Sequence, residues 1–141
     1  MQEMTAEEYR SFMLDHARTA TLATVRADGS PHVAPIWFDL DGDTVVFTTG
    51  ETTLKARNMR RDPRVSLGVD DQEPPFAFVL IEGRAELAAA DPDLLHWATR
   101  IAGRYMGEDL AESYGRRNAV PGELLVRVTP TKIVARKNIA D

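Results

Sequence analysis

Residues 19–50, TATLATVRADGSPHVAPIWFDLDGDTVVFTTG, decide the fold of this chain. Side chains in Ala20–Arg26 alternate between two faces, as they do along a β-strand. Ala27-Asp28-Gly29-Ser30 follows, and an Asp-Gly pair between alternating runs is a strong hairpin signal. Pro31–Leu40 is then a second strand, and Asp41-Gly42 turns the chain into a third, Asp43–Thr49. The stretch therefore predicts a meander of three antiparallel strands.

The segments on either side add helices and further strands. Thr5-Ala-Glu-Glu8 is a capping box that predicts a first helix, and Asp91-Pro92 has the order expected at the start of another. Gly83 marks a bulge or sharp bend in a long strand. The remaining elements are expected at Val65–Val69, Phe76–Ala88, Glu108–Arg117 (a helix), Glu123–Val128 and Lys132–Arg136. Six to seven antiparallel strands with a few helices predict a mainly β protein, a closed or partly closed barrel.

Composition narrows the class of protein. A chain of 141 residues is expected to form one domain, residues 1–141, with a real core. It has no cysteine, which excludes disulfides and thiolate metal sites, and its three histidines are isolated, so no metal is expected. The net charge of −5 argues against nucleic acid as a partner. The acidic start and the lack of a long apolar run predict no membrane partner and a cytoplasmic location.

The most basic segment is Thr48–Arg64, TTGETTLKARNMRRDPR. Thr52 and Thr53 are N-cap candidates for a helix at Leu54–Arg61, and a proline at residue 63 ends it. Within Lys55–Arg64 the five bases are Lys55, Arg57, Arg60, Arg61 and Arg64, against one acid, Asp62. A helix start offers unpaired N–H groups and a positive dipole end, so this segment is suited to bind a phosphate. The alternative is a basic helix that only faces solvent.

Helical spacing separates these charges. Thr53, Arg57 and Arg60 fall on one stripe of the helix, whereas Lys55 and Met59 fall on another. The charges therefore cannot all face one ligand, and Arg61 and Arg64 can instead be surface or interface residues.

Residues that could carry chemistry by themselves are few. Ser30 and His32 are close in sequence, but no nucleophile elbow surrounds them. Trp37 shares a strand face with Pro35, and it is either a core residue or a stacking surface for a ring ligand or a partner chain. With no nucleophile, acid pair or metal ligands, the chemistry has to come from a bound cofactor.

In chain order, these pieces resemble a known family. The combination of ATLATVRADGSPHV and KARNMRRDPRVSL, followed by IEGRAEL, resembles the pyridoxamine-phosphate-oxidase-like (PPOX class) split β-barrel flavoproteins. It is most similar to their actinobacterial deazaflavin branch, the coenzyme F420-dependent oxidoreductases. The resemblance covers residues 5–90 well and the last two strands loosely.

The resemblance implies a homodimer that holds its cofactor in a groove between subunits. The loop and helix at Thr49–Arg61 would bind the cofactor phosphate, with Lys55 as the most regular contact, and Val33–Trp37 and Val46–Thr49 would contact the ring. Catalysis would be hydride transfer by the cofactor. His32 and Tyr105 are candidates for a proton donor. The expected cofactor-binding residues are Val33, Pro35, Ile36, Trp37, Thr48, Thr49, Thr52, Thr53, Lys55, Arg57, Arg60 and Arg61.

The cofactor and the activity stay open between related alternatives. The run Arg60–Arg64 resembles the deazaflavin branch, whereas Thr53 stands where some relatives have arginine. The first expectation is a reductase that passes a hydride from reduced F420 to a conjugated small organic acceptor. The alternatives are an oxidoreductase that uses flavin mononucleotide (FMN), and a cofactor-binding module without turnover. The substrate pocket is expected to include Pro74–Phe78.

Overall fold

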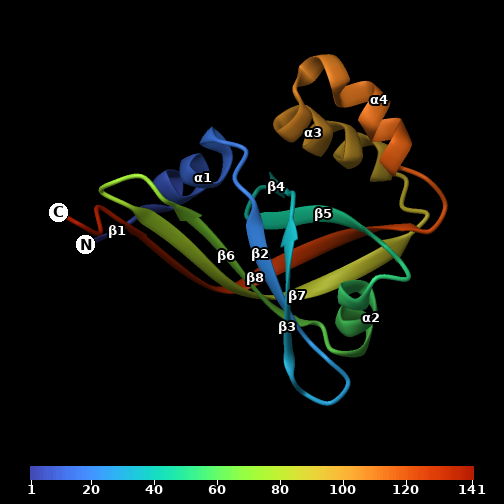
Figure 1. The fold of residues 1–141 in the computed structure, drawn as a ribbon, viewed down its shortest axis with the longest axis horizontal. Coiled ribbons are helices and arrows are strands. Elements are labelled where there is room, and N and C mark those ends of the chain that lie inside the picture. Colours follow the sequence, from blue (N-terminus) through green and yellow to red (C-terminus); the bar gives the residue numbers. More distant parts are fainter.

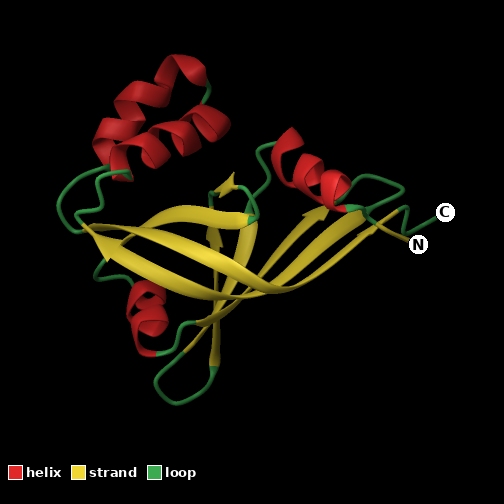
Figure 2. Ribbon diagram, turned by 180° about the vertical axis from the view of Figure 1, so that it is seen from behind, coloured by secondary structure: helices red, strands yellow, loops and turns green.

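Eight strands form one sheet, in the order β3-β2-β6-β7-β8-β5-β4 with β1 paired to β8, in a computed structural model that describes residues 1–141 (Figures 1 and 2). All of the pairings are antiparallel. The strands are β1 Gln2–Glu3, β2 Ala20–Val25, β3 Pro31–Ile36, β4 Asp39–Asp41, β5 Thr44–Gly50, β6 Arg64–Asp71, β7 Ala77–Ala89 and β8 Glu123–Lys137. The helices are α1 Ala6–Asp15, α2 Leu54–Arg61, α3 Leu94–Met106 and α4 Glu108–Asn118. The expected mainly β, split-barrel fold is confirmed.

The predicted three-strand meander is wrong. Pro31–Leu40 is not one strand, because the chain leaves the sheet at Trp37 and Phe38 between β3 and β4. β3 pairs with β2 and β4 pairs with β5, so the two halves lie at opposite ends of the strand order. Side chains of α3 provide the hydrogen bonds that a neighbouring strand would otherwise make to this backbone. The Tyr105 hydroxyl accepts from the Phe38 N–H, and Arg104 donates to the Phe38 carbonyl.

The last two predicted strands are one continuous strand, β8. The sequence places Thr129-Pro130 between them, but the sheet absorbs the proline at an irregularity opposite Glu82 and Gly83. Glu82 pairs with Lys132 and Gly83 pairs with Pro130, which leaves Thr131 as the extra residue of a bulge. The expected irregularity at Gly83 is therefore confirmed.

Most predicted boundaries differ from the observed ones by one or two residues, and two of these differences have a clear cause. β6 runs to Asp71, past the predicted end at Val69, because both added residues pair with β7. The sequence predicts that α3 begins at Asp91-Pro92, whereas its N-cap is Asp93. Asp91 lies two residues earlier, and its carboxylate accepts a hydrogen bond from the Asp93 N–H at 2.9 Å. The first helix is confirmed with its capping box, in which Thr5 and Glu8 bond to each other's backbone.

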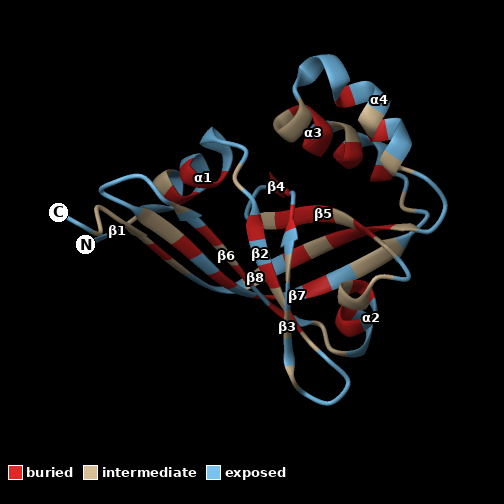
Figure 3. Ribbon diagram, in the orientation of Figure 1, coloured by how far each residue is buried: buried red, intermediate tan, exposed pale blue.

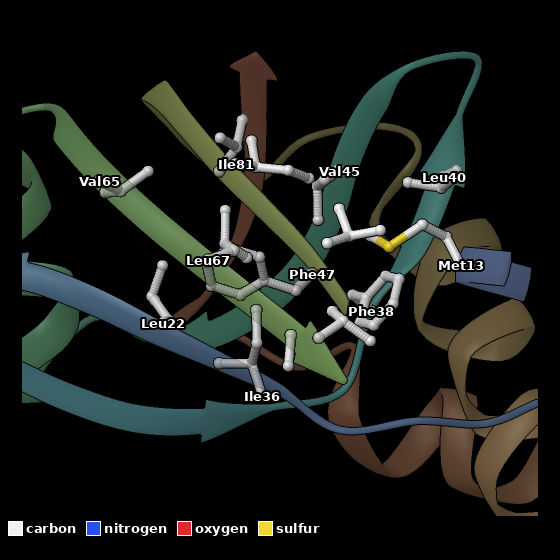
Figure 4. Close-up of a cluster of buried hydrophobic side chains, with 14 of the residues drawn as sticks. Met13, Leu22, Ile36, Phe38, Leu40, Val45, Phe47, Val65, Leu67 and Ile81 are labelled. Atoms are coloured by element: carbon white, nitrogen blue, oxygen red, sulfur yellow. The ribbon is translucent and has the colours of Figure 1, made fainter. Parts of the chain in front are cut away.

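The main core is lined mostly by the strands, and side chains of α1 and Met59 of α2 add to it (Figure 3). Met13, Phe38 and Phe47 are fully buried in this cluster, and Figure 4 draws the ring of Phe47 beside Leu67. Each fully buried side chain of this size stabilises the fold by about 1.5–3 kcal/mol. Along β7, Val79 and Ile81 point into this core, while Leu80 between them is exposed. One face of the central strands therefore builds the interior and the other is left open.

The helices lie on two sides of the strands. In Figure 1, α1 and the α3–α4 pair lie above the sheet and α2 lies below it, where it contacts β2 and β7. None of these helices is both long and apolar enough to cross a lipid bilayer. The arrangement places the basic helix α2 and the end of α3 that carries Tyr105 in different parts of the molecule.

Candidate functional site

The start of α2 is fixed by a threonine cap. The Thr53 hydroxyl accepts from the Ala56 N–H at 3.2 Å and donates to the Gly50 carbonyl at 2.9 Å. It also lies 3.0 Å from the hydroxyl of Thr49, which is buried. Thr52, the other cap candidate, is exposed and makes no side-chain hydrogen bond. The helix has the predicted bounds, and its N-terminus adjoins the end of β5, the strand that also carries half-buried Thr48.

Lys55 occupies the first turn of this helix without a partner in the chain. Its side chain is half-buried and makes no hydrogen bond or ion pair. It lies on the side of the helix that carries Met59, which is buried. A half-buried ammonium beside a helix N-terminus attracts an anion, since both the charge and the helix dipole are positive there.

The arginines of α2 lie elsewhere. Arg57 and Arg61 line a hollow of about 420 Å³ with Arg26 of the β2–β3 hairpin, and neither Lys55 nor Arg60 lines it. Arg61 is held by hydrogen bonds to the Val25 carbonyl (2.7 Å) and the Asn58 side chain (3.0 Å). Arg57 and Arg60 are exposed without a partner. The structure therefore separates Lys55 from Arg57, as the helical spacing predicts, but it brings Arg57 together with Arg61 rather than with Arg60.

Arg64, beyond the helix, is occupied by its neighbour. Its guanidinium lies 2.6 Å from the Asp62 carboxylate. This hydrogen bond, together with a second from the Arg64 backbone, lowers the pKa of Asp62 to about 2. Arg64 therefore has less capacity to bind an external anion than Lys55 has.

Asn58 is a site residue that the sequence reasoning missed. It is fully buried, and its side-chain amide donates to the Thr24 hydroxyl of β2 at 3.0 Å. A signal for it exists in the composition of α2, whose only apolar residues are Leu54, Ala56 and Met59. A helix with so few apolar side chains has to bury a polar one in order to pack against a sheet.

The residues expected to contact the cofactor ring point in different directions. Val33 and Pro35 of β3 are exposed on one face, and Trp37 is 45% exposed just after the strand. Ile36 belongs to the hydrophobic core, so only its backbone can contact a ligand. His32 faces Thr24 across the β2–β3 pair, and its Nδ1 is buried without a hydrogen-bond partner.

Trp37 stacks on Tyr105 of α3. The two ring centroids lie 4.8 Å apart and the planes differ by 3°. The Tyr105 hydroxyl donates to the Arg18 carbonyl at 2.6 Å and accepts from the Phe38 N–H at 3.2 Å. Burial raises the pKa of Tyr105, so the phenol keeps its proton at neutral pH. No hydrogen bond joins His32 and Tyr105, the two proton-donor candidates.

The open face of the sheet carries an apolar hollow of about 440 Å³. Its floor includes Gly68, Leu80 and Val134 from three neighbouring strands, and Glu82 and Lys132 are at its margin. Leu80 is 50% exposed. The sequence reasoning did not single out this face, although the unbroken apolar run FVLI in β7 is a signal that both faces of the strand meet apolar surroundings.

Comparison with known proteins places this geometry in a family. Residues 5–137 match the family model of pyridoxamine 5'-phosphate oxidase. General stress protein 26 of Bacillus subtilis (strain 168) is 32% identical over 101 residues, which are 69% of this chain and 71% of that protein.

Two solved structures extend the likeness over most of the fold. A conserved hypothetical protein from Mycobacterium tuberculosis superposes with a TM-score of 0.82, at 29% identity over 96% of this chain and 86% of that one. A protein described as an F420 reductase superposes with a TM-score of 0.69, at 28% identity over 87% of this chain and 94% of that one. The expected relationship is confirmed, and this chain belongs to the pyridoxamine 5'-phosphate oxidase family.

Proposed function

We propose that this protein is an oxidoreductase that uses the deazaflavin coenzyme F420 and transfers a hydride from the reduced cofactor to a conjugated small organic acceptor. The observation that carries the proposal is Lys55, a half-buried ammonium without a partner at the capped N-terminus of α2. The family and the similarity to an F420 reductase support an oxidoreductase with a flavin-type cofactor. FMN is the alternative cofactor, because the PPOX-class proteins that the sequence resembles include flavoproteins.

The residues present fit such a cofactor in two respects. Lys55 and the free N–H groups of the first turn of α2 suit a phosphate. The exposed side chains of Val33, Pro35 and Trp37 offer an apolar and aromatic surface for a planar ring. The cofactor, when bound, supplies the hydride chemistry.

The chain's own residues bind the cofactor, orient it and supply a proton. Lys55 holds the phosphate, while Val33 and Trp37 exclude water from the ring they cover. His32 stays the candidate proton donor, because both hydrogen-bonding directions of the Tyr105 hydroxyl are used by the backbone of Arg18 and Phe38. Tyr105 therefore orients the neighbouring Trp37 ring rather than transferring a proton.

The proposal includes a homodimer. The apolar hollow on the open face of the sheet gives a second copy a surface to cover, since Leu80 is 50% exposed and its cross-strand neighbour Val134 is half-buried. A cofactor groove between two copies would then draw residues from both chains. A light-scattering mass equal to one chain at working concentration contradicts this assembly.

A paired titration tests the function. The protein is titrated with FMN and with oxidised deazaflavin, each followed by the ring fluorescence, and the better ligand identifies the cofactor. Single-turnover oxidation of the reduced cofactor is then measured against quinones, enones and tetrapyrroles. Binding of the deazaflavin with reduction of no acceptor favours a binding module without turnover. Binding of FMN alone favours the FMN-dependent oxidoreductase, and binding of neither returns α2 to a solvent-facing basic helix.

A further inference from the structure

One edge of β8 has no neighbour over residues 129–134. Along its other edge, β8 pairs with β7 over most of its length. On the edge in question it pairs with β5 up to Val128 and with β1 from Arg136, and the Met4 N–H adds a hydrogen bond to the Ala135 carbonyl. No strand lies beside β8 between these two partners. The wall of the barrel is therefore open there.

Ile133 shows that this opening reaches the interior. It pairs with Ile81 of β7, so the two side chains point to the same side of the sheet. Ile81 is 1% exposed and belongs to the main core, whereas Ile133 is 38% exposed. A neighbouring strand would cover Ile133 if the pairing of β8 continued. Solvent therefore meets the margin of the core at this residue.

A hollow of about 250 Å³ occupies the opening, between α1 and β8. Met4, Ala6, Tyr9, Ile133 and Ala135 give it an apolar lining. Tyr9 belongs both to this lining and to the main core cluster. An apolar cavity of about 150 Å³ is sufficient to bind benzene. The hollow is therefore large enough for a molecule of one ring with a short substituent.

The charged groups around this hollow are paired with one another or with neighbours. The carboxylate of Asp43, which lines it, lies 2.8 Å from the guanidinium of Arg10. Arg136 and Glu3, which also line it, lie 3.2 Å apart. Each pair joins one positive and one negative group, so neither leaves a net charge for a ligand to neutralise. The hollow therefore favours a neutral molecule.

The Tyr9 hydroxyl is a buried polar group without a partner. Tyr9 is 4% exposed, and its hydroxyl oxygen makes no hydrogen bond within the chain. Burial and the nearby charge of Asp43 raise the pKa of Tyr9 to about 12, so the phenol keeps its proton at neutral pH. A donor that has lost water without gaining a partner favours any molecule that brings it an acceptor. The oxygen of a ketone or an ester is such an acceptor.

We propose that the hollow between α1 and β8 binds a small neutral molecule with one apolar ring and one hydrogen-bond acceptor, and that the Tyr9 hydroxyl donates to that acceptor. None of the expected cofactor-binding residues lines this hollow. In Figure 1, α1 lies above the sheet, whereas α2, which carries Lys55, lies below it. The site is therefore separate from the one that carries the proposed function, and neither depends on the other.

The experiment compares three probes of similar shape. Acetophenone is neutral and joins one ring to one carbonyl group. α-Methylstyrene has a methylene group in place of the carbonyl oxygen, and benzoate carries a negative charge. Binding is followed by NMR through the methyl signals of Ile133, which lines the hollow.

Three variants accompany the probes. Tyr9→Phe removes the donor and keeps the ring. Ala6→Leu fills part of the hollow from an exposed position of α1. Leu14→Ala is the control, because Leu14 is on the same helix but does not line the hollow.

We expect acetophenone to shift the Ile133 signals saturably and to bind more tightly than either other probe. Tyr9→Phe should weaken acetophenone binding about 2- to 12-fold, the effect of one lost hydrogen bond, and should leave the affinity for α-methylstyrene unchanged. Ala6→Leu should weaken both about 5-fold or more, because the added side chain competes for the space. Leu14→Ala should bind all three probes as the wild type does.

The outcomes separate this proposal from the proposed function. Absence of a saturable shift with acetophenone in the wild type overturns the proposal, and the hollow then holds only solvent. Equal acetophenone affinity in the wild type and Tyr9→Phe overturns the assigned hydrogen bond and the proposal with it. Ala6→Leu should bind FMN or oxidised deazaflavin as the wild type does, and a loss of that affinity would overturn the separate site. Binding of acetophenone without binding of either cofactor supports this site and overturns the proposed function.

Discussion

The side-chain amide of Asn58 donates a hydrogen bond to the hydroxyl of Thr24 over 3.0 Å, and both residues are buried. The Asn58 carbonyl oxygen accepts from Arg61, which also bonds to the Val25 carbonyl. These contacts connect α2 to β2. The helix that presents Lys55 is therefore held against the sheet by polar contacts as well as by Met59 and Ala56.

Removal of this hydrogen bond should destabilise the fold. Asn58→Ala leaves the Arg61 donor and the Thr24 hydroxyl without their partner, which costs about 1–3 kcal/mol. Thr24→Val should cost a similar amount, and the double variant less than the sum, with a coupling of about 0.5–3 kcal/mol. Urea unfolding measures the stability of the wild type, the two single variants and the double variant. Arg60→Ala is the control, because that side chain is exposed and unpaired and its change should stay within about 0.5 kcal/mol. Strict additivity of the two substitutions would show that the bond contributes nothing.

Lys55→Ala should weaken cofactor binding by about 1–3 kcal/mol, the range for a lost charge-assisted hydrogen bond. Arg60→Ala should also weaken it, and Arg64→Ala much less, because Arg64 is already paired with Asp62. Added salt should weaken binding more in the wild type than in Lys55→Ala, since the screened charge is absent from the variant. Fluorescence titration at two salt concentrations measures both effects. Equal affinities across the four proteins would remove the phosphate site from α2.

The local parts of this site were predictable, and the tertiary parts were not. The bounds of α2 follow from its threonine cap and from the proline at residue 63, which are local signals. The bond between Asn58 and Thr24 joins distant segments and leaves no periodicity in either. The break at Phe38 was missed for the same reason, because its backbone is satisfied by Tyr105 and Arg104, which come much later in the chain.

The α3–α4 pair makes a second prediction about stability. A Cβ added at Gly115 would lie 2.2 Å from the Thr99 Oγ1 and 2.8 Å from the Thr99 Cα, which is backbone and cannot rotate away. Gly115→Ala should therefore destabilise by about 1–3 kcal/mol, the usual cost of overpacking. Gly68→Ala is a matched control, because its nearest neighbour would be the Leu80 Cδ2 at 3.5 Å, an ordinary contact. Thermal unfolding compares the two, and similar midpoints would show that the helices separate at little cost.

Tyr9 combines a buried ring with a hydroxyl that has no hydrogen-bond partner. Burial, reinforced by the nearby charge of Asp43, raises the pKa of Tyr9 to about 12. An unfolded tyrosine titrates near about 10, so the folded state holds this proton more tightly. The corresponding stability is complete below pH of about 10 and is lost as pH rises toward 12.

Tyr9→Phe should remove that dependence and cost nothing at neutral pH. A buried hydroxyl without a partner costs about 1–3 kcal/mol of desolvation, so its removal should leave the free energy of unfolding at pH 7 unchanged or raise it by up to that amount. Between pH 10 and 11.5, the wild type should lose stability more steeply than the variant, since only the wild type has to ionise Tyr9 on unfolding. The other two tyrosines, Tyr105 and Tyr114, are present in both proteins and cancel in the comparison. Urea unfolding at closely spaced pH values measures both terms. A loss of stability in Tyr9→Phe at pH 7, with a slope above pH 10 as steep as in the wild type, would mean that the hydroxyl has a partner and titrates normally.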